Sequence, residues 1–308
     1  MTGVGFVCAC QGLSTDTFYE TGCERPMNPV LKYRGGKIRE IPRFLSYIPN
    51  DFDRYIEPFL GGGALFFHIE PEYAVLNDIN TRLMGFYRQL RNGYPKMREQ
   101  FDALQAEYEK NQITYKTLKT ERPDERVPNA NEDLYYRLRS LYNYPDETWL
   151  EGVLYFFINK TSYSGMLRYN RCGDYNVPFG RYPYFNTQRV TEHHSELLQR
   201  AELFSVDYSQ IFSMAGKNDF IFLDPPYDSV FNDYGNIEFI NGFDETEHRR
   251  LAADFEKLPC RALMVVGKTP LTLSLYGNYV CDEYHKNYAV NIRNRFNNGS
   301  THIVVKNY

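Results

Sequence analysis

The chain has 308 residues, a net charge of −4 at pH 7, and ordinary proportions of apolar (43%) and charged (24%) residues, as expected for a folded protein of one or two domains. This charge excludes a polycation, so any contact with nucleic acid must come from a local basic patch. No stretch approaches the roughly 18 apolar residues of a membrane-spanning helix. The N-terminus also lacks the basic region of a signal peptide, so we expect a cytoplasmic protein with no membrane partner.

Six cysteines occur without a CxxC pair or a His/Cys cluster at zinc spacing, which predicts reduced thiols and no metal site. The 27 tyrosines and 22 phenylalanines fit either an aromatic-rich core or a surface that stacks on bases. Residues 1–26 show no periodicity, and Met27 precedes the first organised segment. We therefore expect residues 1–28 to be a poorly ordered extension, either dispensable or read from a wrong upstream start codon.

The organised chain opens with residues 31–37 (LKYRGGK), where two adjacent glycines allow a tight turn and a close approach to a ligand. Lys37 follows at the start of a helical pattern formed by Ile38, Ile41 and Leu45. A lysine beside a glycine turn is more often solvated than functional, so this stretch alone does not identify a site.

Residues 54–67 read as a short strand, a triple-glycine turn and an apolar helix, which is the ligand-binding unit of nucleotide-binding α/β folds. Glu57 stands where the strand ends and favours a cationic ligand over a phosphate. The spacing matches neither Gly-x-Gly-x-x-Gly nor Gly-Lys-Ser/Thr, which disfavours dinucleotides and nucleoside triphosphates. A second strand, residues 73–77, ends at Asp78, which can hold a ribose diol or belong to the turn that begins the next helix.

From Thr81 the pattern is helical, and the sheet returns only at residues 202–206. Further strands are predicted at residues 220–223, 262–266 and 302–306. These elements predict an α/β fold with a Rossmann-like sheet, built from residues 29–80 and 200–308. A mainly helical subdomain, residues 81–199, is inserted between the second and third strands.

The end of this insertion, residues 159–182, combines basic and aromatic residues. Between residues 155 and 190 five basic residues accompany one acid, Asp174, which gives a local charge of +4 in a chain of net charge −4. This composition is typical of a loop that binds nucleic acid, although a tyrosine-rich hairpin with solvated arginines would look the same. Residues 286–298 are also basic and aromatic and suggest a second hairpin that contacts the nucleic-acid backbone.

Residues 220–227 (FIFLDPPY) place an acid, two prolines and an aromatic residue after a short buried strand. The prolines end the strand, so Asp224 and Tyr227 lie at its carboxyl end, where open α/β sheets bind ligands. The Asp224 carboxylate and the Pro225 carbonyl can accept the N–H groups of a planar amine, and the Tyr227 ring can stack on the base that carries it. The alternative is a strand followed by a structural proline turn.

The order of these motifs resembles the Dam-type DNA adenine-N6 methyltransferases, the alpha group or D12 class, over most of residues 29–308. Residues 32–37 resemble the family's N-terminal cofactor motif, residues 57–63 its glycine loop, residues 77–80 its ribose motif and residues 224–227 its catalytic motif. Two segments depart from the family: YSGM at residues 163–166, where Phe/Tyr-Asn-Gly-Leu is common, and the chain from Lys286 onward.

The resemblance implies an S-adenosylmethionine-dependent methyltransferase fold with a DNA-recognition insert. It also implies S-adenosylmethionine as cofactor, double-stranded DNA as partner, and a bacterial or phage setting in which a restriction endonuclease is a further candidate partner. The implied catalytic residues are Asp224, Pro225, Pro226 and Tyr227. The implied cofactor-binding residues are Tyr33, Arg34, Gly35, Lys37, Glu57, Pro58, Phe59, Gly61, Gly63, Asp78, Ile79, Asp207 and Asp224. The implied DNA-binding residues are Tyr163, Met166, Arg168, Asn170, Arg171, Asn176, Pro178 and Arg181.

Within that family, Arg168, Met166 and Pro178 match positions that read base edges in GATC-specific members. An arginine in the major groove pairs best with guanine, and apolar side chains suit a thymine methyl group. Tyr163 would stack in the gap left by a flipped adenine, and Arg171 and Arg181 are candidates for phosphate contacts. The expected target is therefore an adenine preceded by guanine, within GATC or a related site containing GAT.

Three alternatives stay open on the sequence alone. An RNA or free-base amino-methyltransferase could use the same site, although the long insert with its NVPFG loop argues against it. A cytosine-N4 enzyme usually carries serine where this chain has Asp224. A decayed methyltransferase that only binds DNA is disfavoured because Asp224, Tyr227, Lys37 and Asp78 are all present.

Overall fold

A computed structural model describes residues 26–33, 35–227, 243–287 and 299–308. Most of the predicted extension, residues 1–25, and most of the second basic hairpin, residues 288–298, lie outside this described part. Two residues assigned to the extension do contact the fold: the Met27 amide donates to Glu70, and the Asn28 carbonyl accepts from His194. Met27 and Asn28 are therefore part of the folded chain.

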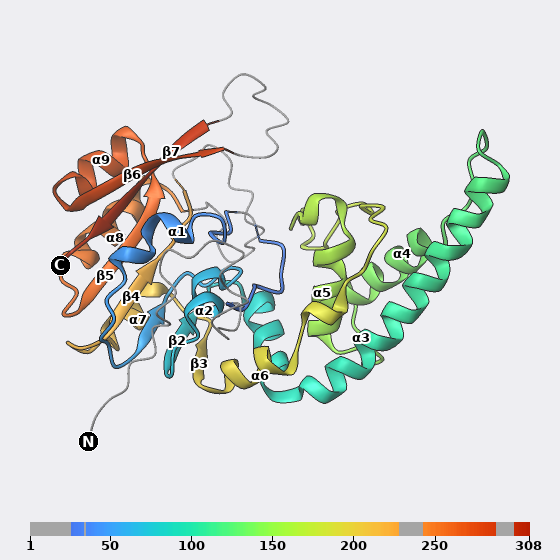
Figure 1. The fold of residues 1–308 in the computed structure, drawn as a ribbon, viewed down its shortest axis with the longest axis horizontal. Helices are drawn as coiled ribbons and strands as arrows, with labels where there is room; N and C mark the ends of the chain where they lie inside the picture. The colour runs from blue at the N-terminus through green and yellow to red at the C-terminus, as the bar shows by residue number, and fades with distance from the viewer. Residues whose placement is uncertain (1–25, 34, 228–242, 288–298) are drawn as a thin grey trace, which may run out of the picture.

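A single seven-stranded sheet in the order β3-β2-β1-β4-β5-β7-β6 forms the centre of the α/β part (Figure 1). Its strands are β1 (Tyr55–Glu57), β2 (Ala74–Asn77), β3 (Ala201–Phe204), β4 (Phe220–Leu223), β5 (Arg261–Gly267), β6 (Val280–Asn287) and β7 (Gly299–Lys306). The first five strands are parallel, and β7 runs antiparallel between β5 and β6. The carboxyl ends of β1 to β5 therefore meet at one edge of the sheet, as predicted for an α/β fold.

Strand β6 is the one strand of this sheet that the sequence does not predict. It carries Asp282, Glu283, His285 and Lys286 and pairs with β7 alone, so it forms the outer edge. An edge strand tolerates charged residues on its exposed side, and this removes the apolar pattern by which buried strands are recognised.

Helices cover both faces of the sheet, and further helices form the chain between β2 and β3. The helix bounds are α1 (Ile41–Phe44), α2 (Ala64–Ile69), α3 (Thr81–Glu121), α4 (Ala130–Asn143), α5 (Glu151–Thr161), α6 (Glu192–Gln199), α7 (Tyr208–Ser213), α8 (Glu245–Phe255) and α9 (Pro270–Tyr276). Alternate residues of β4 enter different cores: Phe220 and Phe222 pack with α1 and α2, whereas Ile221 and Leu223 pack with α7 and α8. No helix in the described ranges is both long and apolar enough to span a membrane.

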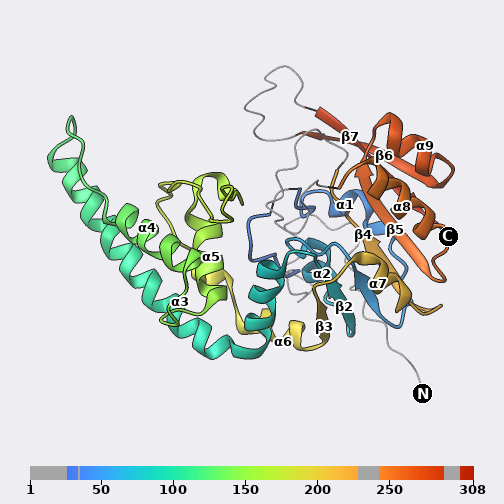
Figure 2. The same cartoon turned by 180° about the vertical axis from the view of Figure 1, so that it is seen from behind.

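The chain between β2 and β3 is helical and extends away from the sheet (Figures 1 and 2). Asn80 caps its first helix, α3, by accepting a hydrogen bond from the Leu83 amide at 3.0 Å. Gly93 has non-helical angles and Pro95 follows, so α3 bends there. The bend separates two groups of buried apolar residues, one that ends at Leu90 and one that begins at Met97.

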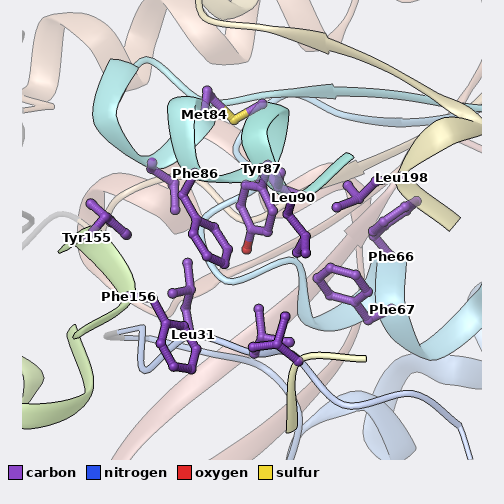
Figure 3. Close-up of a cluster of buried hydrophobic side chains, with 14 of the residues drawn as sticks. Leu31, Phe66, Phe67, Met84, Phe86, Tyr87, Leu90, Tyr155, Phe156 and Leu198 are labelled. Atoms are coloured by element: carbon purple, nitrogen blue, oxygen red, sulfur yellow. The ribbon is translucent and has the colours of Figure 1, made fainter. Parts of the chain in front are cut away.

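The insert shares its hydrophobic core with the α/β part (Figure 3). Phe86 of α3 stacks on Phe156 of α5, with ring centroids 6.1 Å apart, and the same cluster includes Phe66 and Phe67 of α2. It continues into the segment that follows α5 through Tyr175, Val177 and Phe179. Most of the aromatic residues in the described chain are therefore core residues, which favours an aromatic-rich core over a base-stacking surface as the reason for their number.

A buried carboxylate, Glu40, connects the N-terminal segment to the β6–β7 pair. It accepts hydrogen bonds from Tyr284 (2.7 Å), Lys286 (2.5 Å) and His302 (2.7 Å). Burial alone would raise the pKa of Glu40, but the His302 hydrogen bond, the nearby Lys37 charge and the hydrogen bonds from Lys286 and Tyr284 lower it to about 2. Since an ionised carboxylate can only accept, the Nδ1 atom of His302 carries the proton.

We expect Glu40→Gln to lower the free energy of unfolding by about 2–4 kcal/mol at pH 7, because it removes one member of a buried charge network. The folded-state pKa of about 2 lies below the ordinary 4.5, so this stabilisation is complete above pH 4.5 and is lost as the pH falls towards 2. Denaturant unfolding of both proteins at several pH values measures the difference. Glu283→Gln is the matched control, because Glu283 is an exposed carboxylate of β6, the strand that carries Tyr284 and Lys286, and it is paired with Lys268. An equal effect of the two substitutions at pH 7 would contradict this assignment.

Candidate active site

A pocket opens at the carboxyl ends of the parallel strands, where the loops after β1, β2 and β4 meet. In the loop after β1, Gly61 and Gly63 have φ values of +49° and +65°, and Gly61 lines the pocket. A Cβ atom on Gly61 would lie 2.7 Å from the ring of Tyr33. This glycine is therefore required both for its left-handed backbone and for the close packing of Tyr33 on the loop.

Asp78, at the tip of β2, is tied into the same loop. One carboxylate oxygen accepts from the Gly61 amide and the other from the Asn80 amide, both at 2.9 Å. Asp78 is 7% exposed and lines the pocket. Because each carboxylate oxygen can accept more than one hydrogen bond, this fixed group can also receive hydroxyl donors from a ligand.

Asn77 holds three strand tips together, a role that the sequence did not predict. Its side-chain amide donates to the carbonyls of Pro58 and Val206, and its oxygen accepts from the Val206 amide. These contacts join the loops after β1, β2 and β3. An asparagine at the end of a strand carries no sequence signal for such a role, because it is equally common in ordinary turns.

Lys37, Asp224 and Tyr227 form the polar centre of the pocket. The Lys37 ammonium lies 2.5 Å from the Asp224 carboxylate and 2.5 Å from the Tyr227 hydroxyl, and it also donates to the Gly35 carbonyl. Its side chain is only 2% exposed, whereas that of Asp224 is 22% exposed. Burial raises the pKa of the Asp224 carboxyl, and the Lys37 charge and hydrogen bond oppose that rise.

The interactions of Asp224 leave it able to receive a ligand. Lys37 contacts its Oδ1 atom, and no residue in the described part of the chain donates to its Oδ2 atom or to the Pro225 carbonyl. Asp224 and Pro225 both line the pocket, so two consecutive residues of its wall each carry an acceptor that no described donor uses. This arrangement suits a group with two N–H donors in one plane.

Glu57 is a second carboxylate in the pocket wall and is almost completely buried. It accepts a hydrogen bond from the Tyr55 hydroxyl at 2.7 Å, and no lysine or arginine of the described ranges pairs with it. Burial raises the pKa of the Glu57 carboxyl well above its usual range. A cationic ligand beside it would favour the ionised form.

Aromatic residues make the apolar end of the pocket. Phe59 packs against Tyr208 and Phe243, with ring centroids 5.4 and 5.9 Å apart. Asp207 also lines this end, but its carboxylate binds Arg250 at 2.8 Å and the Ser209 hydroxyl at 2.6 Å. Asp207 is thus held by neighbouring side chains as the N-cap of α7.

The structure brings nearly all the predicted cofactor and catalytic residues into this one pocket. Arg34 lies outside the described residues, and Gly63 is not part of the pocket wall. The pocket also includes residues that the sequence did not predict, among them Leu60, Ala64, Leu65, Asn77, Val206, Tyr208, Phe222 and Phe243. Within the described ranges, no group of three or more His, Cys, Asp or Glu side chains could hold a metal ion.

The predicted DNA-binding residues lie on a hairpin-like segment, residues 162–182, which contacts Lys32, the residue before Tyr33 of the pocket wall. Its two halves pair at Ser162–Phe179 and at Tyr169–Tyr175. Tyr135 of α4 donates to the Val177 carbonyl at 2.7 Å and holds the segment on the insert.

The exposed side chains of this segment differ in how they are held. Arg168 donates to Asn176 at 2.9 Å, so its guanidinium has a fixed direction, and Tyr163 is 46% exposed. Asn170 is used within the turn, where it accepts from the amides of Cys172 and Asp174. Met166 is half-buried, whereas Arg171, Pro178 and Arg181 are exposed, and Arg181 lies 3.4 Å from Glu132.

Two kinds of comparison identify relatives. Residues 33–292 match the family model described as D12 class N6 adenine-specific DNA methyltransferase. The chain is 35% identical over 289 residues to the Type II methyltransferase M.CviBI of Paramecium bursaria Chlorella virus NC1A, covering 92% of this chain and 100% of the relative.

More distant relatives cover nearly as much of the chain. It is 27% identical to the Type II methyltransferase M1.LlaDCHI of Lactococcus lactis subsp. cremoris, over 92% of this chain and 96% of that protein. It is 28% identical to the DNA adenine methylase of Salmonella typhi, over 88% of this chain and 90% of that protein. With Asp224-Pro225-Pro226-Tyr227 directly after β4 and a family match across most of its length, the chain belongs to the D12 class of N6 adenine-specific DNA methyltransferases.

Proposed function

We propose that this enzyme transfers a methyl group from S-adenosylmethionine to the N6 atom of adenine in duplex DNA, at GATC or a related site that contains GAT. The observation that carries the proposal is the arrangement of Lys37, Asp224 and Tyr227 in a pocket that also holds Asp78. The relatives from Paramecium bursaria Chlorella virus NC1A and Lactococcus lactis subsp. cremoris bear the name Type II methyltransferase. We therefore include a companion restriction endonuclease as a candidate partner.

The chemistry of the pocket fits S-adenosylmethionine. Asp78 offers fixed acceptors for a ribose diol, and the wall of Phe59, Tyr208 and Phe243 suits an adenine ring. Glu57 is a buried carboxylate that would favour the positively charged end of the molecule. When bound, the cofactor supplies an electrophilic methyl group.

Asp224 and Pro225 would prepare the adenine for the reaction. The lone pair on N6 is delocalised into the ring, which makes the amine a poor nucleophile. The Oδ2 atom of Asp224 and the carbonyl of Pro225 would accept the two N6–H groups and localise that lone pair on nitrogen. The amine loses one proton on methylation, and the Asp224 carboxylate is placed to accept it.

Lys37 and Tyr227 would hold this arrangement in place. The ammonium of Lys37 fixes both Asp224 and the Tyr227 hydroxyl, and it lies 4.9 Å from the centroid of the tyrosine ring. The Tyr227 ring also packs beside His302, with centroids 5.3 Å apart. A ring fixed in this way can stack on a base that has left the duplex, and catalysis would depend on positioning and electrostatics.

Asp78→Ala is expected to weaken S-adenosylmethionine binding by about 1.5–3 kcal/mol, because charged hydrogen bonds to the ribose are lost. Isothermal titration calorimetry measures the change. Asp78→Asn keeps one acceptor oxygen, so its affinity for S-adenosylmethionine should fall between those of the wild type and Asp78→Ala. Asp133→Ala, on the exposed face of α4, is the control. Equal dissociation constants for wild type and Asp78→Ala would rule out the ribose role.

Asp224→Ala is expected to reduce methyl transfer at least about a hundredfold at saturating DNA and cofactor, because an acceptor for N6–H is removed. Mass spectrometry of nucleosides from a treated duplex measures N6-methyldeoxyadenosine directly. The unfolding temperature is measured for both proteins, because the substitution leaves the buried Lys37 ammonium without its carboxylate partner. A variant that retains more than about one hundredth of the wild-type rate would exclude this acceptor role.

Arg168→Ala should relax the preference for guanine before the target adenine, because a bidentate contact to guanine contributes about 1–3 kcal/mol of discrimination. Methylation rates on duplexes that differ only at this position measure the effect. Arg171→Ala is the comparison: if Arg171 binds phosphate, its loss weakens all duplexes equally and makes the salt dependence shallower. An unchanged site preference in Arg168→Ala would overturn the assignment.

A further inference from the structure

A second groove adjoins the candidate active site and has no role in the reaction described above. We call it the α1–β6 groove; it is lined by Tyr33, Gly35, Gly36, Ile38, Arg39, Glu40, Arg43, Tyr284, His285 and Lys286. The first three of these residues also line the catalytic pocket. The groove therefore runs outward from the mouth of that pocket.

The groove carries a surplus of positive charge. Its three permanent cations are Arg39, Arg43 and Lys286, and its single carboxylate, Glu40, is bound to Lys286 and His302 in the buried network. The formal balance of +2 contrasts with a whole chain of net charge −4. Arg39 and Arg43 are exposed, and neither forms an ion pair with a carboxylate in the described part of the chain. Two cations thus line the groove without a carboxylate partner among the described residues.

Strand β6, which lines the groove, and the insert belong to opposite edges of the sheet. The insert leaves the sheet between β2 and β3, at one edge, whereas β6 forms the other edge. Figure 1 shows α1, β6 and β7 on one side and the insert on the other. A duplex that contacts the hairpin-like segment and places a flipped base in the pocket would extend beyond the pocket. The α1–β6 groove adjoins the pocket and could therefore contact that part of the duplex.

We propose that the α1–β6 groove binds phosphates of the substrate DNA backbone, with Arg39 and Arg43 as the contacting cations. This assignment rests on the proposed action on duplex DNA. It gives the enzyme two DNA contacts with different tasks: the segment at residues 162–182 reads bases, and the groove holds the backbone beside the flipped nucleotide. Contacts to phosphate fix the position of the duplex and carry no sequence information.

The test is the salt dependence of DNA binding by the Arg39→Gln/Arg43→Gln double variant. Each neutralised phosphate contributes about 0.9 to the slope of log K against log salt, so the slope should become shallower by about 1.8. Between about 50 and about 200 mM salt, the wild type should then lose about tenfold more affinity than the variant. The charge-matched control is Arg200→Gln/Lys217→Gln, because these exposed residues lie at the amino ends of β3 and β4.

Three results would overturn the proposal. The double variant could keep the wild-type slope, its affinity for S-adenosylmethionine in the absence of DNA could fall, or its base preference could change. The second result would assign the groove to the cofactor and the third to base reading. Failure of the proposed function is a separate observation, because the wild type itself would then neither bind nor methylate the duplex.

Discussion

The ion pair between Lys37 and Asp224 joins two segments that lie 187 residues apart in sequence. A buried ammonium is strongly disfavoured unless it is paired and hydrogen-bonded, so the N-terminal segment must meet the tip of β4 for either side chain to be accommodated. The same ammonium fixes the Tyr227 hydroxyl. The geometry of the catalytic motif thus depends on a residue near the start of the chain.

The geometry of Asp224 and Tyr227 also depends on the far edge of the sheet, through the hydrogen bonds of Glu40. Glu40 follows Lys37 by three residues and receives donors from β6 and β7. His302 of β7 packs in turn beside Tyr227. Breaking the network would therefore destabilise the outer strands and the packing of His302 beside Tyr227. None of the members of the network is required to contact the substrate.

Local patterns predicted the parts of the fold that local chemistry determines. Prolines after a buried apolar run place Asp224 at a strand tip, and glycines after β1 allow a left-handed turn at Gly61. Contacts between distant segments could not be predicted. Asn77, Glu40 and His302 are ordinary polar residues whose roles arise only when the strands are assembled, and the charged strand β6 lacks the apolar alternation that marks a buried strand.

Base-resolution mapping of modified DNA from cells that express the enzyme reports the modified base, its position and its sequence context in one experiment. We expect N6-methyladenine preceded by guanine, within GATC or another site containing GAT, and no such modification in cells that express Asp224→Ala. Methylation at cytosine N4, or N6-methyladenine without a preference for a preceding guanine, would contradict this expectation.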